Sequence, residues 1–340
     1  MTSEQDPQYI DATRRRMVAG AAGALIAAAY APQAAAQSST PQPHFPSKPI
    51  RIIIPYGAGS STDIAMRLIA PRMAEKLGQP IVIENRAGGT GIIGSEFVAK
   101  SPPDGYTLVA GTVASHAALV PLMPGMPYNV RTDFTPIGLA VVPPAIVAIH
   151  PAVPAKNISE FVAWSKQQPA GVSYASSGSG GSGHLATELL KLKTGANLVH
   201  VPYKDASRAV TDLMAGHVQL MVYYATLLPH IRAGKLRALA VLSDKRVAFA
   251  PDIPTAAEQG LPISVSGWIG LFGPAGLPAP VRDAIYAAMR EALLDPAIQP
   301  QMLSSGQEPQ PLPPLEFGKF VDAEIARWTE VVRAANIKME

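Results

Sequence analysis

Residues 50–63 have the sequence Ile-Arg-Ile-Ile-Ile-Pro-Tyr-Gly-Ala-Gly-Ser-Ser-Thr-Asp, and this stretch determines the predicted fold class. Its short β-branched run is typical of a strand that is buried on both faces of a parallel sheet. A polar loop follows at 57–62, and residues 63–77 favour a helix that stops at Gly78. Because Pro71 lies inside this helix, we expect a kink or a break there.

The same order of strand, loop and helix recurs along the chain. Short apolar runs predict further strands at 81–83, 106–110, 145–149, 172–175, 198–201, 218–223 and 236–242. Helices are predicted at 184–193, 207–215 and 227–233, with two more that end at Ala99 and before Pro169. This alternation predicts parallel α/β sheets. A final helix is predicted to bury one apolar face, formed by Phe317, Phe320, Val321, Ile325, Trp328 and Val332.

Length and composition limit the classes of protein and site. A chain of 340 residues suggests two domains. Its formal net charge is +3, and no basic cluster follows 14–16, which argues against a nucleic-acid partner. The absence of cysteine removes disulfides and thiolate sites, and the seven histidines are not spaced as a metal motif. We therefore expect no metal and no cofactor.

The N-terminus has the parts of an export signal. Arginines at 14–16 precede a mild apolar stretch at 17–30, and a small-residue run follows at 34–36. The paired arginines favour the twin-arginine route, so we expect a signal over 1–36, a linker over 37–46 and a mature protein in the periplasm. The alternatives are a membrane anchor or a tail without function. An apolar stretch of about 14 residues is, however, shorter than the about 20 that a membrane span needs.

Three polar glycine loops follow predicted strands, at 56–63, 88–94 and 176–184. Glycine lets a ligand approach the backbone, and the following helix offers unpaired N–H groups and the positive end of its dipole to a carboxylate or phosphate. Such loops lie at the carboxyl ends of parallel strands, so the three together predict a binding cleft. The alternative is that they are merely tight turns with serine caps.

Patterns for nucleotide binding and catalysis are weak. Two of the loops match G-x-G-x-x-G, but no acidic residue ends the next predicted strand, and we reject a dinucleotide site. No G-x-S-x-G elbow is present. Ser179 and His184 could form a nucleophile pair, although a histidine at a helix start more often touches backbone or ligand. Asp63 could act as a general base, but a carboxylate at a helix start is more often a cap.

Several phrases of the sequence together carry a family resemblance. They are Lys-Pro-Ile-Arg-Ile-Ile-Ile-Pro-Tyr-Gly-Ala-Gly at 48–59, Gly-Gln-Pro-Ile-Val-Ile-Glu-Asn-Arg-Ala-Gly at 78–88, Pro-Asp-Gly-Tyr-Thr-Leu at 103–108, Tyr-Ala-Ser-Ser-Gly-Ser-Gly at 174–180 and His-Val-Pro-Tyr-Lys at 200–204. The stretches 234–241 and 251–255 add to them. From about residue 46 to 337, the chain resembles the Bug-type, TctC-like receptors of tripartite tricarboxylate transport systems.

The resemblance implies a type II periplasmic binding fold, with two α/β lobes, a central cleft and two crossover strands. Lobe 1 would comprise 47–141 and 242–340, and lobe 2 would comprise 142–241. In this family, loop and helix-start groups of both lobes hold a ligand carboxylate, partly through ordered water. The implied ligand-binding residues are Tyr56, Ala58, Gly59, Ser60, Ser61, Asp63, Thr112, Ser115, Ser177, Gly178, Ser179, Tyr203, Asp205 and Tyr223.

The implied function is that of a monomeric periplasmic receptor, not an enzyme, which closes on a small carboxylate and delivers it to membrane transporter subunits. Two alternatives stay open. One is an exported α/β hydrolase that uses Ser179 and His184. The other is a receptor that hands its closed form to a membrane sensor.

The sequence departs from the family pattern at two places. Asp205 stands where the family usually has glycine, and Tyr223 and Tyr224 stand near the end of a strand where the family usually has aspartate. A phenol in place of a carboxylate removes an acceptor for a ligand ammonium and adds a flat surface and a hydroxyl. This exchange favours a plain or aromatic carboxylate, such as a citrate-like or terephthalate-type ligand, over an amino acid.

Overall fold

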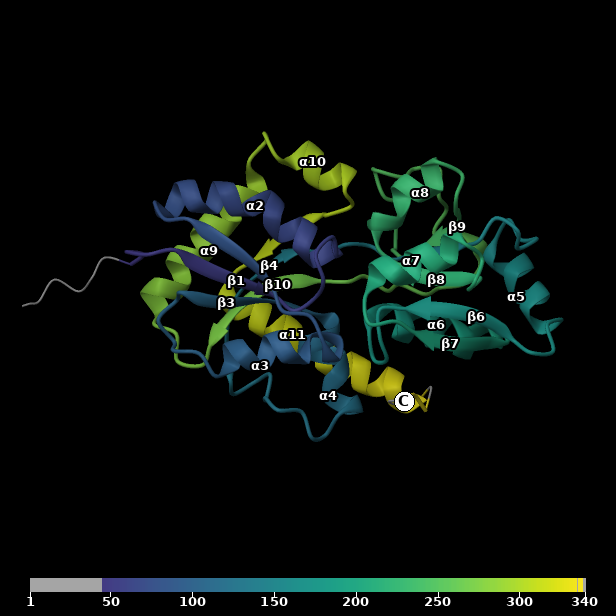
Figure 1. Ribbon diagram of the computed structural model, residues 1–340, viewed down its shortest axis with the longest axis horizontal. Coiled ribbons are helices and arrows are strands. Elements are labelled where there is room, and N and C mark those ends of the chain that lie inside the picture. Colours follow the sequence, from purple (N-terminus) through teal and green to yellow (C-terminus); the bar gives the residue numbers. More distant parts are fainter. Residues whose placement is uncertain (1–44, 335, 339–340) are drawn as a thin grey trace, which may run out of the picture. The chain divides into compact units, whose positions relative to one another are not determined.

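The computed structural model describes residues 45–334 and 336–338. The expected export signal at 1–36 and residues 37–44 of the expected linker lie outside the described residues. The described strands form two separate sheets, one of six strands and one of five, whose elements make two groups in Figure 1. We call these groups lobe 1 and lobe 2. None of the helices in the described ranges combines the length and the apolar character that spanning a bilayer requires.

The sheet of lobe 1 has the strand order β11-β4-β10-β3-β1-β2. Strands β1, β2 and β3 are parallel, whereas β10 is antiparallel to both β3 and β4, and β11 is antiparallel to β4. The strands are β1 (Ile50–Ile54), β2 (Ile81–Asn85), β3 (Thr107–Thr112), β4 (Phe134–Val141), β10 (Ile269–Pro274) and β11 (Pro309–Leu312).

Helices cover both faces of this sheet, because alternate residues of its strands are buried in opposite directions. Ile52 packs in one apolar cluster with α2 and α9, while its neighbour Ile53 belongs to a second cluster with α3 and α11. The helices of lobe 1 are α2 (Ser61–Leu77), α3 (Ile92–Ala99), α4 (Leu119–Leu122), α9 (Ala279–Leu294), α10 (Gln299–Ser304) and α11 (Pro314–Ala334).

The sheet of lobe 2 has the order β7-β6-β8-β5-β9. Strands β6, β7 and β8 are parallel, and β5 is antiparallel to β8 and β9. The strands are β5 (Ile146–Ile149), β6 (Val172–Ser176), β7 (Leu198–Pro202), β8 (Leu220–Tyr223) and β9 (Arg237–Val241). The helices of lobe 2 are α5 (Ile158–Lys166), α6 (Ser182–Thr194), α7 (Ala206–Met214) and α8 (Leu228–Arg232).

Two connections join the lobes. The outgoing connection, 142–145, leads from β4 to β5, and the return connection, 242–268, leads from β9 to β10. They meet where Pro144 pairs with Ser266 and where the Gly267 N–H donates to the carbonyl of Pro143 at 2.9 Å. Since β4 and β10 are also neighbours in the sheet, the chain leaves and re-enters lobe 1 through one pair of adjacent strands.

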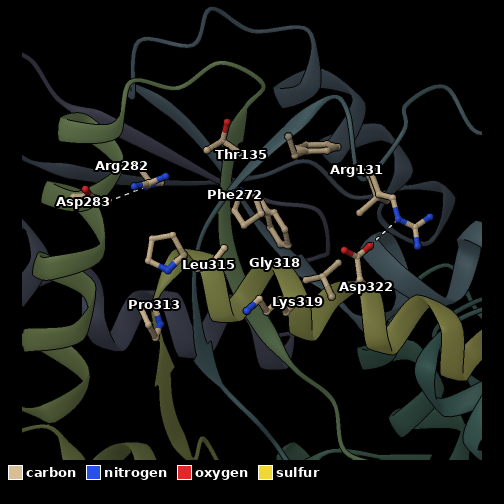
Figure 2. A pocket seen from close by; sticks show the side chains of 15 residues that line it. Arg131, Thr135, Phe272, Arg282, Asp283, Pro313, Leu315, Gly318, Lys319 and Asp322 are labelled. Atoms are coloured by element: carbon tan, nitrogen blue, oxygen red, sulfur yellow. Dashed lines mark hydrogen bonds and ion pairs between the residues drawn. The ribbon is translucent and has the colours of Figure 1, made fainter.

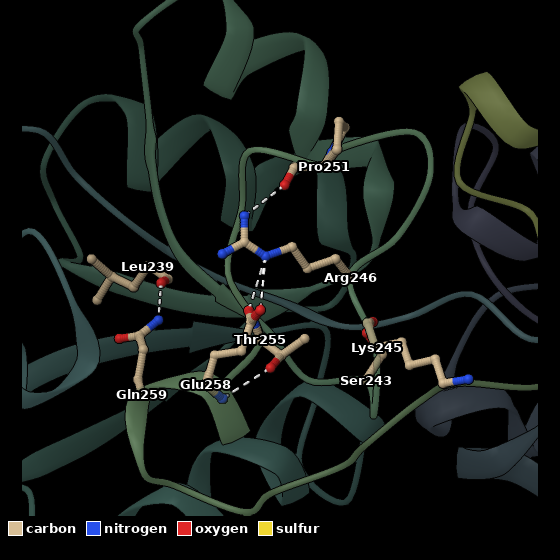
Figure 3. Close-up of polar contacts among 8 residues, drawn as sticks. All are labelled: Leu239, Ser243, Lys245, Arg246, Pro251, Thr255, Glu258 and Gln259. Atoms are coloured by element: carbon tan, nitrogen blue, oxygen red, sulfur yellow. Dashed lines mark hydrogen bonds and ion pairs between the residues drawn. The ribbon is translucent and has the colours of Figure 1, made fainter.

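The first part of the return connection is attached to lobe 2 (Figure 3). Arg246 donates to both carboxylate oxygens of Glu258 at 3.0 Å, and Gln259 donates to the carbonyl of Leu239 in β9 at 2.7 Å. The Val241 N–H also donates to the carbonyl of Pro254. These contacts favour a lobe boundary later in the return connection than the one at 241/242. The boundaries given above for the two lobes stay predictions.

The structure corrects two expectations. The sheets are mixed, not parallel, because β10 and β11 run against the other strands of lobe 1 and β5 runs against the other strands of lobe 2. The strands β4, β10 and β11 escaped prediction because prolines and glycines interrupt their patterns; a Cβ at Gly270, for example, would lie 2.2 Å from the Phe317 ring. Of the kink or break expected at Pro71, the break is wrong, because α2 is one continuous helix. Pro71 and Arg67 are both exposed, so water can bond the Arg67 carbonyl that the proline leaves unpaired.

A buried carboxylate fastens the return connection to α11. Glu324 accepts hydrogen bonds from the indole N–H groups of Trp268 at 3.1 Å and Trp328 at 3.2 Å. Arg327 pairs with the other oxygen of this carboxylate and donates to the carbonyl of Ser264 at 2.6 Å. Both tryptophans are 1% exposed, so their N–H groups depend on Glu324 for an acceptor.

Replacing Glu324 with alanine should therefore destabilise the fold by about 3 kcal/mol, because two buried donors lose their acceptor. The midpoint of urea unfolding measures this change. The matched control is Asp322→Ala on the same helix, which removes an exposed ion pair with Arg131 and should cost at most about 0.5 kcal/mol. Equal shifts for the two variants would contradict the role assigned to Glu324.

Candidate functional site

Two adjoining hollows lie between the lobes. The first, which we call the hinge-side hollow, is bounded by Pro143 and Trp268 at the connections. The second, the loop-side hollow, reaches the loops at 55–60, 87–91 and 204–207. Their empty volumes, which include space open to solvent, are about 430 and 410 Å³. The hollows form one cleft, since both are lined by Tyr56, Ser60, Thr90, Ser177 and Tyr223.

The wall from lobe 1 is the start of α2. Ser60 caps this helix by accepting the Asp63 N–H at 3.3 Å, and Ser60, Ser61 and Thr62 line the hinge-side hollow. The first N–H groups of a helix have no partner inside it, and its dipole places positive charge there. A ligand anion in this hollow therefore meets donors and a favourable potential without a cationic side chain.

Asp63 supports this wall from behind. Its carboxylate accepts hydrogen bonds from the Gly59 N–H at 3.0 Å, Arg67 at 2.9 Å and Asn85 at 2.9 Å. Burial raises the pKa of Asp63, but these hydrogen bonds outweigh it and lower the pKa below the usual value. Asp63 is 3% exposed and lines neither hollow, so it braces the 57–59 loop.

Behind the loop at 88–94, a phenol and two hydroxyls form a second polar group. The Tyr56 hydroxyl is hydrogen-bonded to the Thr112 hydroxyl at 2.6 Å, and the Thr112 N–H donates to Ser115 at 3.1 Å. Burial raises the pKa of Tyr56, so the phenol stays neutral. Gly91 is required here, because a Cβ would lie 2.9 Å from the Tyr56 hydroxyl.

The wall from lobe 2 is the loop between β6 and α6. The residue before α6 is Gly181, which offers no side-chain cap, so the first N–H groups of this helix are open to the hollow that Ser182 lines. His184 supports the loop from below, because its Nδ1 accepts the Gly180 N–H at 3.0 Å. Its ring stacks on His200 with centroids 4.0 Å apart. Burial, with a smaller contribution from the charge of His200, lowers the pKa of His184 to about 3.

The end of β8 adds two phenols to the cleft. Tyr224 donates to the Ser182 hydroxyl at 2.5 Å, and the Tyr223 hydroxyl interacts with the backbone N–H of Ser61 at the start of α2. Burial raises the pKa of both phenols well above the usual value, so both are neutral hydrogen-bonding groups. The Tyr224 ring also lies against Gly267 in the return connection, where a Cβ would be 2.5 Å from the ring.

The structure places some of the sequence-predicted site residues in the cleft and others behind it. The residues that line a hollow are Tyr56, Ala58, Ser60, Ser61, Thr112, Ser177, Asp205 and Tyr223. Those that line neither hollow are Gly59, Asp63, Ser115, Gly178, Ser179 and Tyr203. Of these, Tyr203 donates to Asp212 at 2.9 Å, and Ser179 contributes its carbonyl to a contact with lobe 1. The role of the whole set in ligand binding stays a prediction.

Sequence reasoning missed several lining residues, notably Thr90, Ser182, Tyr224 and Trp268. Thr90 and Ser182 stand in loops that the glycine pattern identified, but the pattern did not show that their side chains face the cleft. Tyr224 was noted at the end of its strand as a departure from the family pattern, but it was not included in the predicted site. Trp268 lies in the return connection, far along the chain from the glycine loops, and no motif around it in the sequence marks it as a cleft residue.

The hinge-side hollow has no charged lining residue, while Lys204 and Asp205 line the loop-side hollow. Asp205 caps α7, because its carboxylate accepts the Arg208 N–H at 2.9 Å. Within the described ranges, no group of three histidine or acidic side chains is arranged to hold a metal ion.

A further hollow of about 1220 Å³ belongs to lobe 1 alone (Figure 2). It lies between the starts of α9 and α11, and its arginines are paired: Arg131 with Asp322 at 2.6 Å and Arg282 with Asp283 at 2.8 Å. A ligand in this hollow would touch only one lobe and could not bias a movement between the two. The cleft between the lobes is therefore the better candidate.

Comparisons with known proteins agree with this geometry. The family described as the tripartite tricarboxylate transporter family receptor, TctC, matches residues 65–337. The chain belongs to the TctC receptor family. This TctC receptor is therefore a solute-binding protein and not an enzyme, which makes the hydrolase alternative wrong. His184 agrees with this conclusion, since its Nδ1 is occupied by the Gly180 N–H instead of a serine hydroxyl.

Three solved structures are similar to the TctC receptor. Rpa4515 from R. palustris, with adipate, is 33% identical with a TM-score of 0.84 and covers 87% of this chain and 100% of its own. The periplasmic binding protein BugD is 32% identical with a TM-score of 0.82, covering 87% and 100%. MatC from Rhodopseudomonas palustris, with bound malate, is 33% identical with a TM-score of 0.80, covering 85% and 100%. These matches confirm the predicted two-lobed periplasmic binding fold.

The buried histidines predict a pH dependence. The pKa of His116, like that of His184, is lowered by burial to about 3 from 6.5. The unfolded chain then binds more protons between pH 6.5 and 3, so stability is fully present above pH 6.5 and falls as the pH decreases. Each histidine adds up to about 1.4 kcal/mol per pH unit to this slope. Thermal unfolding followed from pH 7 to pH 4 measures the effect.

In His184→Asn, the amide oxygen can still accept the Gly180 N–H but does not titrate, so the decline with acid should be shallower than in the wild type. The control is Ser179→Ala in the same loop, which removes no titrating group and should keep the wild-type slope. A slope that is identical in His184→Asn and the wild type would refute the assignment.

Proposed function

We propose that this TctC receptor captures a small carboxylate with an apolar body in the cleft between its lobes and delivers it to the membrane subunits of a tripartite tricarboxylate transporter. The observation that carries the proposal is that α2 of lobe 1 and α6 of lobe 2 both begin at the uncharged hinge-side hollow. A carboxylate that touches both helix starts binds both lobes at once. Its binding energy then favours the arrangement in which the lobes are together.

The lining of the cleft supports a plain carboxylate over an amino acid. A ligand ammonium needs an acceptor of negative charge, and the hinge-side hollow offers only neutral groups. Trp268, Ile269 and Tyr224 supply apolar surface on the same side. A dicarboxylate or an aromatic carboxylate satisfies both features. Two of the related structures contain dicarboxylates, namely adipate and malate.

The location we propose is the periplasm, reached through the export signal expected at 1–36, with the mature chain beginning near residue 37. In this compartment the receptor would act as a monomer that meets its transporter only transiently. The proposed cycle needs no covalent step, because closure around the ligand and reopening at the membrane are changes in a hinge equilibrium.

Mature protein, residues 37–340, should gain thermal stability from one class of carboxylate. At a concentration of 100 times the dissociation constant, a ligand that binds only the folded state adds about 2.7 kcal/mol. The panel comprises malate, adipate, citrate, benzoate and terephthalate, with glutamate as the matched amino acid. Stabilisation by a plain carboxylate but not by glutamate supports the proposal, and stabilisation by glutamate alone contradicts it.

The phenol of Tyr223 should contribute to the affinity for that carboxylate. Tyr223→Phe keeps the ring and removes the hydroxyl at the start of α2, so the dissociation constant from calorimetry should rise about fivefold, as expected for one neutral hydrogen bond. The control is Tyr203→Phe, whose hydroxyl bonds Asp212 outside both hollows and whose loss should leave the affinity within twofold. The reverse order of effects would remove Tyr223 from the site.

A further inference from the structure

Thr90 has a backbone conformation that its own side chain disfavours. It lies at φ 54° and ψ 35°, between Gly89 at φ 55° and Gly91 at φ 98°, in a left-handed turn. A β-branched residue rarely adopts this conformation, whereas glycine adopts it readily. The turn is fixed within lobe 1, since the N–H groups of Gly91 and Ile93 both donate to the carbonyl of Gly88. Strain that is held in this way at a ligand cleft points to a function of the side chain.

The Thr90 side chain reaches across the cleft. Its hydroxyl donates to the carbonyl of Ser179 in lobe 2 at 3.1 Å. The approach is close, because a Cβ at Gly178 would lie 2.8 Å from this hydroxyl and one at Gly181 would lie 3.7 Å from the Thr90 methyl group. Gly178 of the lobe 2 loop thus makes room for the threonine of lobe 1, and a Cβ at Gly181 would lie at ordinary van der Waals distance from it.

One peptide unit of the loop is held from both lobes. The peptide that joins Ser179 to Gly180 has its carbonyl bonded to Thr90 of lobe 1 and its N–H bonded to His184 of lobe 2. This peptide comes directly before Gly181, where α6 begins without a side-chain cap. Fixing the peptide therefore fixes the direction of the open N–H groups at the start of α6.

We propose that Thr90 is a positioning residue, whose hydroxyl ties the glycine turn of lobe 1 to the 177–181 loop and so holds the start of α6 against the bound ligand. This inference rests on the proposed function in that the ligand is a carboxylate held between the lobes. Threonine at this position lowers the stability of lobe 1 but helps to retain the ligand. Glycine would remove the backbone strain of the turn, but it has no hydroxyl to donate to the Ser179 carbonyl.

Three variants separate the hydroxyl from the backbone strain. Thr90→Val keeps the β-branched shape and removes the hydroxyl, Thr90→Ser keeps the hydroxyl, and Thr90→Gly removes both hydroxyl and strain. The dissociation rate of adipate, measured by stopped flow, should rise about fivefold for Val and Gly and stay within twofold for Ser. The unfolding temperature of the ligand-free protein should rise by about 2 °C for Gly only.

A second measurement is independent of the ligand's identity. Because the chain has no cysteine, Lys100→Cys at the end of α3 and Lys193→Cys near the end of α6 provide two unique positions for spin labels, one on each lobe. Both lysines are exposed. The distances between the labels are measured without ligand and with adipate. The fraction of molecules with a short distance between the labels, in which the lobes are together, should be smaller in Thr90→Val than in the wild type. It should be unchanged in Thr90→Ser.

The outcomes separate this inference from the proposed function. Equal distance distributions in the wild type and Thr90→Val would overturn the inference, as would a wild type without any closed population in either condition. Equal losses in Thr90→Ser and Thr90→Val would also overturn it, because the hydroxyl would then not be responsible. If none of the five carboxylates of the stability panel binds but Thr90→Val still loses the closed population, the inference stands and the proposed ligand class fails.

Discussion

Anion binding in the hinge-side hollow depends on the starts of helices, because no cationic side chain lines it. The first N–H groups of α2 and α6 have no acceptor within their helices, and both helices begin at the same uncharged hollow. The α2 start is satisfied only in part, by Ser60 and the Tyr223 hydroxyl, and α6 has no side-chain cap. A single helix start contributes little, so a carboxylate held in this way needs both, one from each lobe. On the function proposed above, recognition and closure would be one event, because the ligand would complete a set of donors to which both lobes contribute.

The rest of the fold keeps these two helix starts in place without locking them together. In the part of the chain that the structure describes, the lobes are joined only through 142–145 and 242–268, which meet at the bridge between Pro144 and Ser266. Trp268 follows this meeting point and lines the hinge-side hollow, and its indole N–H donates to Glu324 on α11. The wall of the cleft nearest the hinge is thus anchored in the core of lobe 1, while the 243–259 segment is anchored to lobe 2.

The local part of this structure could be predicted from the sequence, and the non-local part could not. The β-branched run at 50–54, with its glycine loop and helix, predicts the strand, the cleft loop and the helix start, because all three follow from adjacent residues. Strand β10 shows no alternating pattern, because its glycines make room for the rings of Phe317 and other side chains from distant elements. At the cleft, the pattern identifies loops that line the hollows but not the orientation of each side chain. Asp63 and Tyr203 illustrate this limit: both stand in or next to a predicted loop, and both are occupied by structural partners behind the cleft.

A third helix also begins at the cleft, and its cap limits where the ligand's charge can lie. The start of α7, at Ala206 and Ser207, lines the loop-side hollow and would attract an anion like the other two. Its first turn is already capped by Asp205, whose carboxylate brings negative charge to the same hollow. A ligand carboxylate there would meet a like charge and a donor already in use, although Lys204 lines the same hollow. On the function proposed above, the carboxylates of the ligand would lie at α2 and α6, and the loop-side hollow, where Lys204 and Asp205 carry opposite charges, would hold a part of the ligand without net charge.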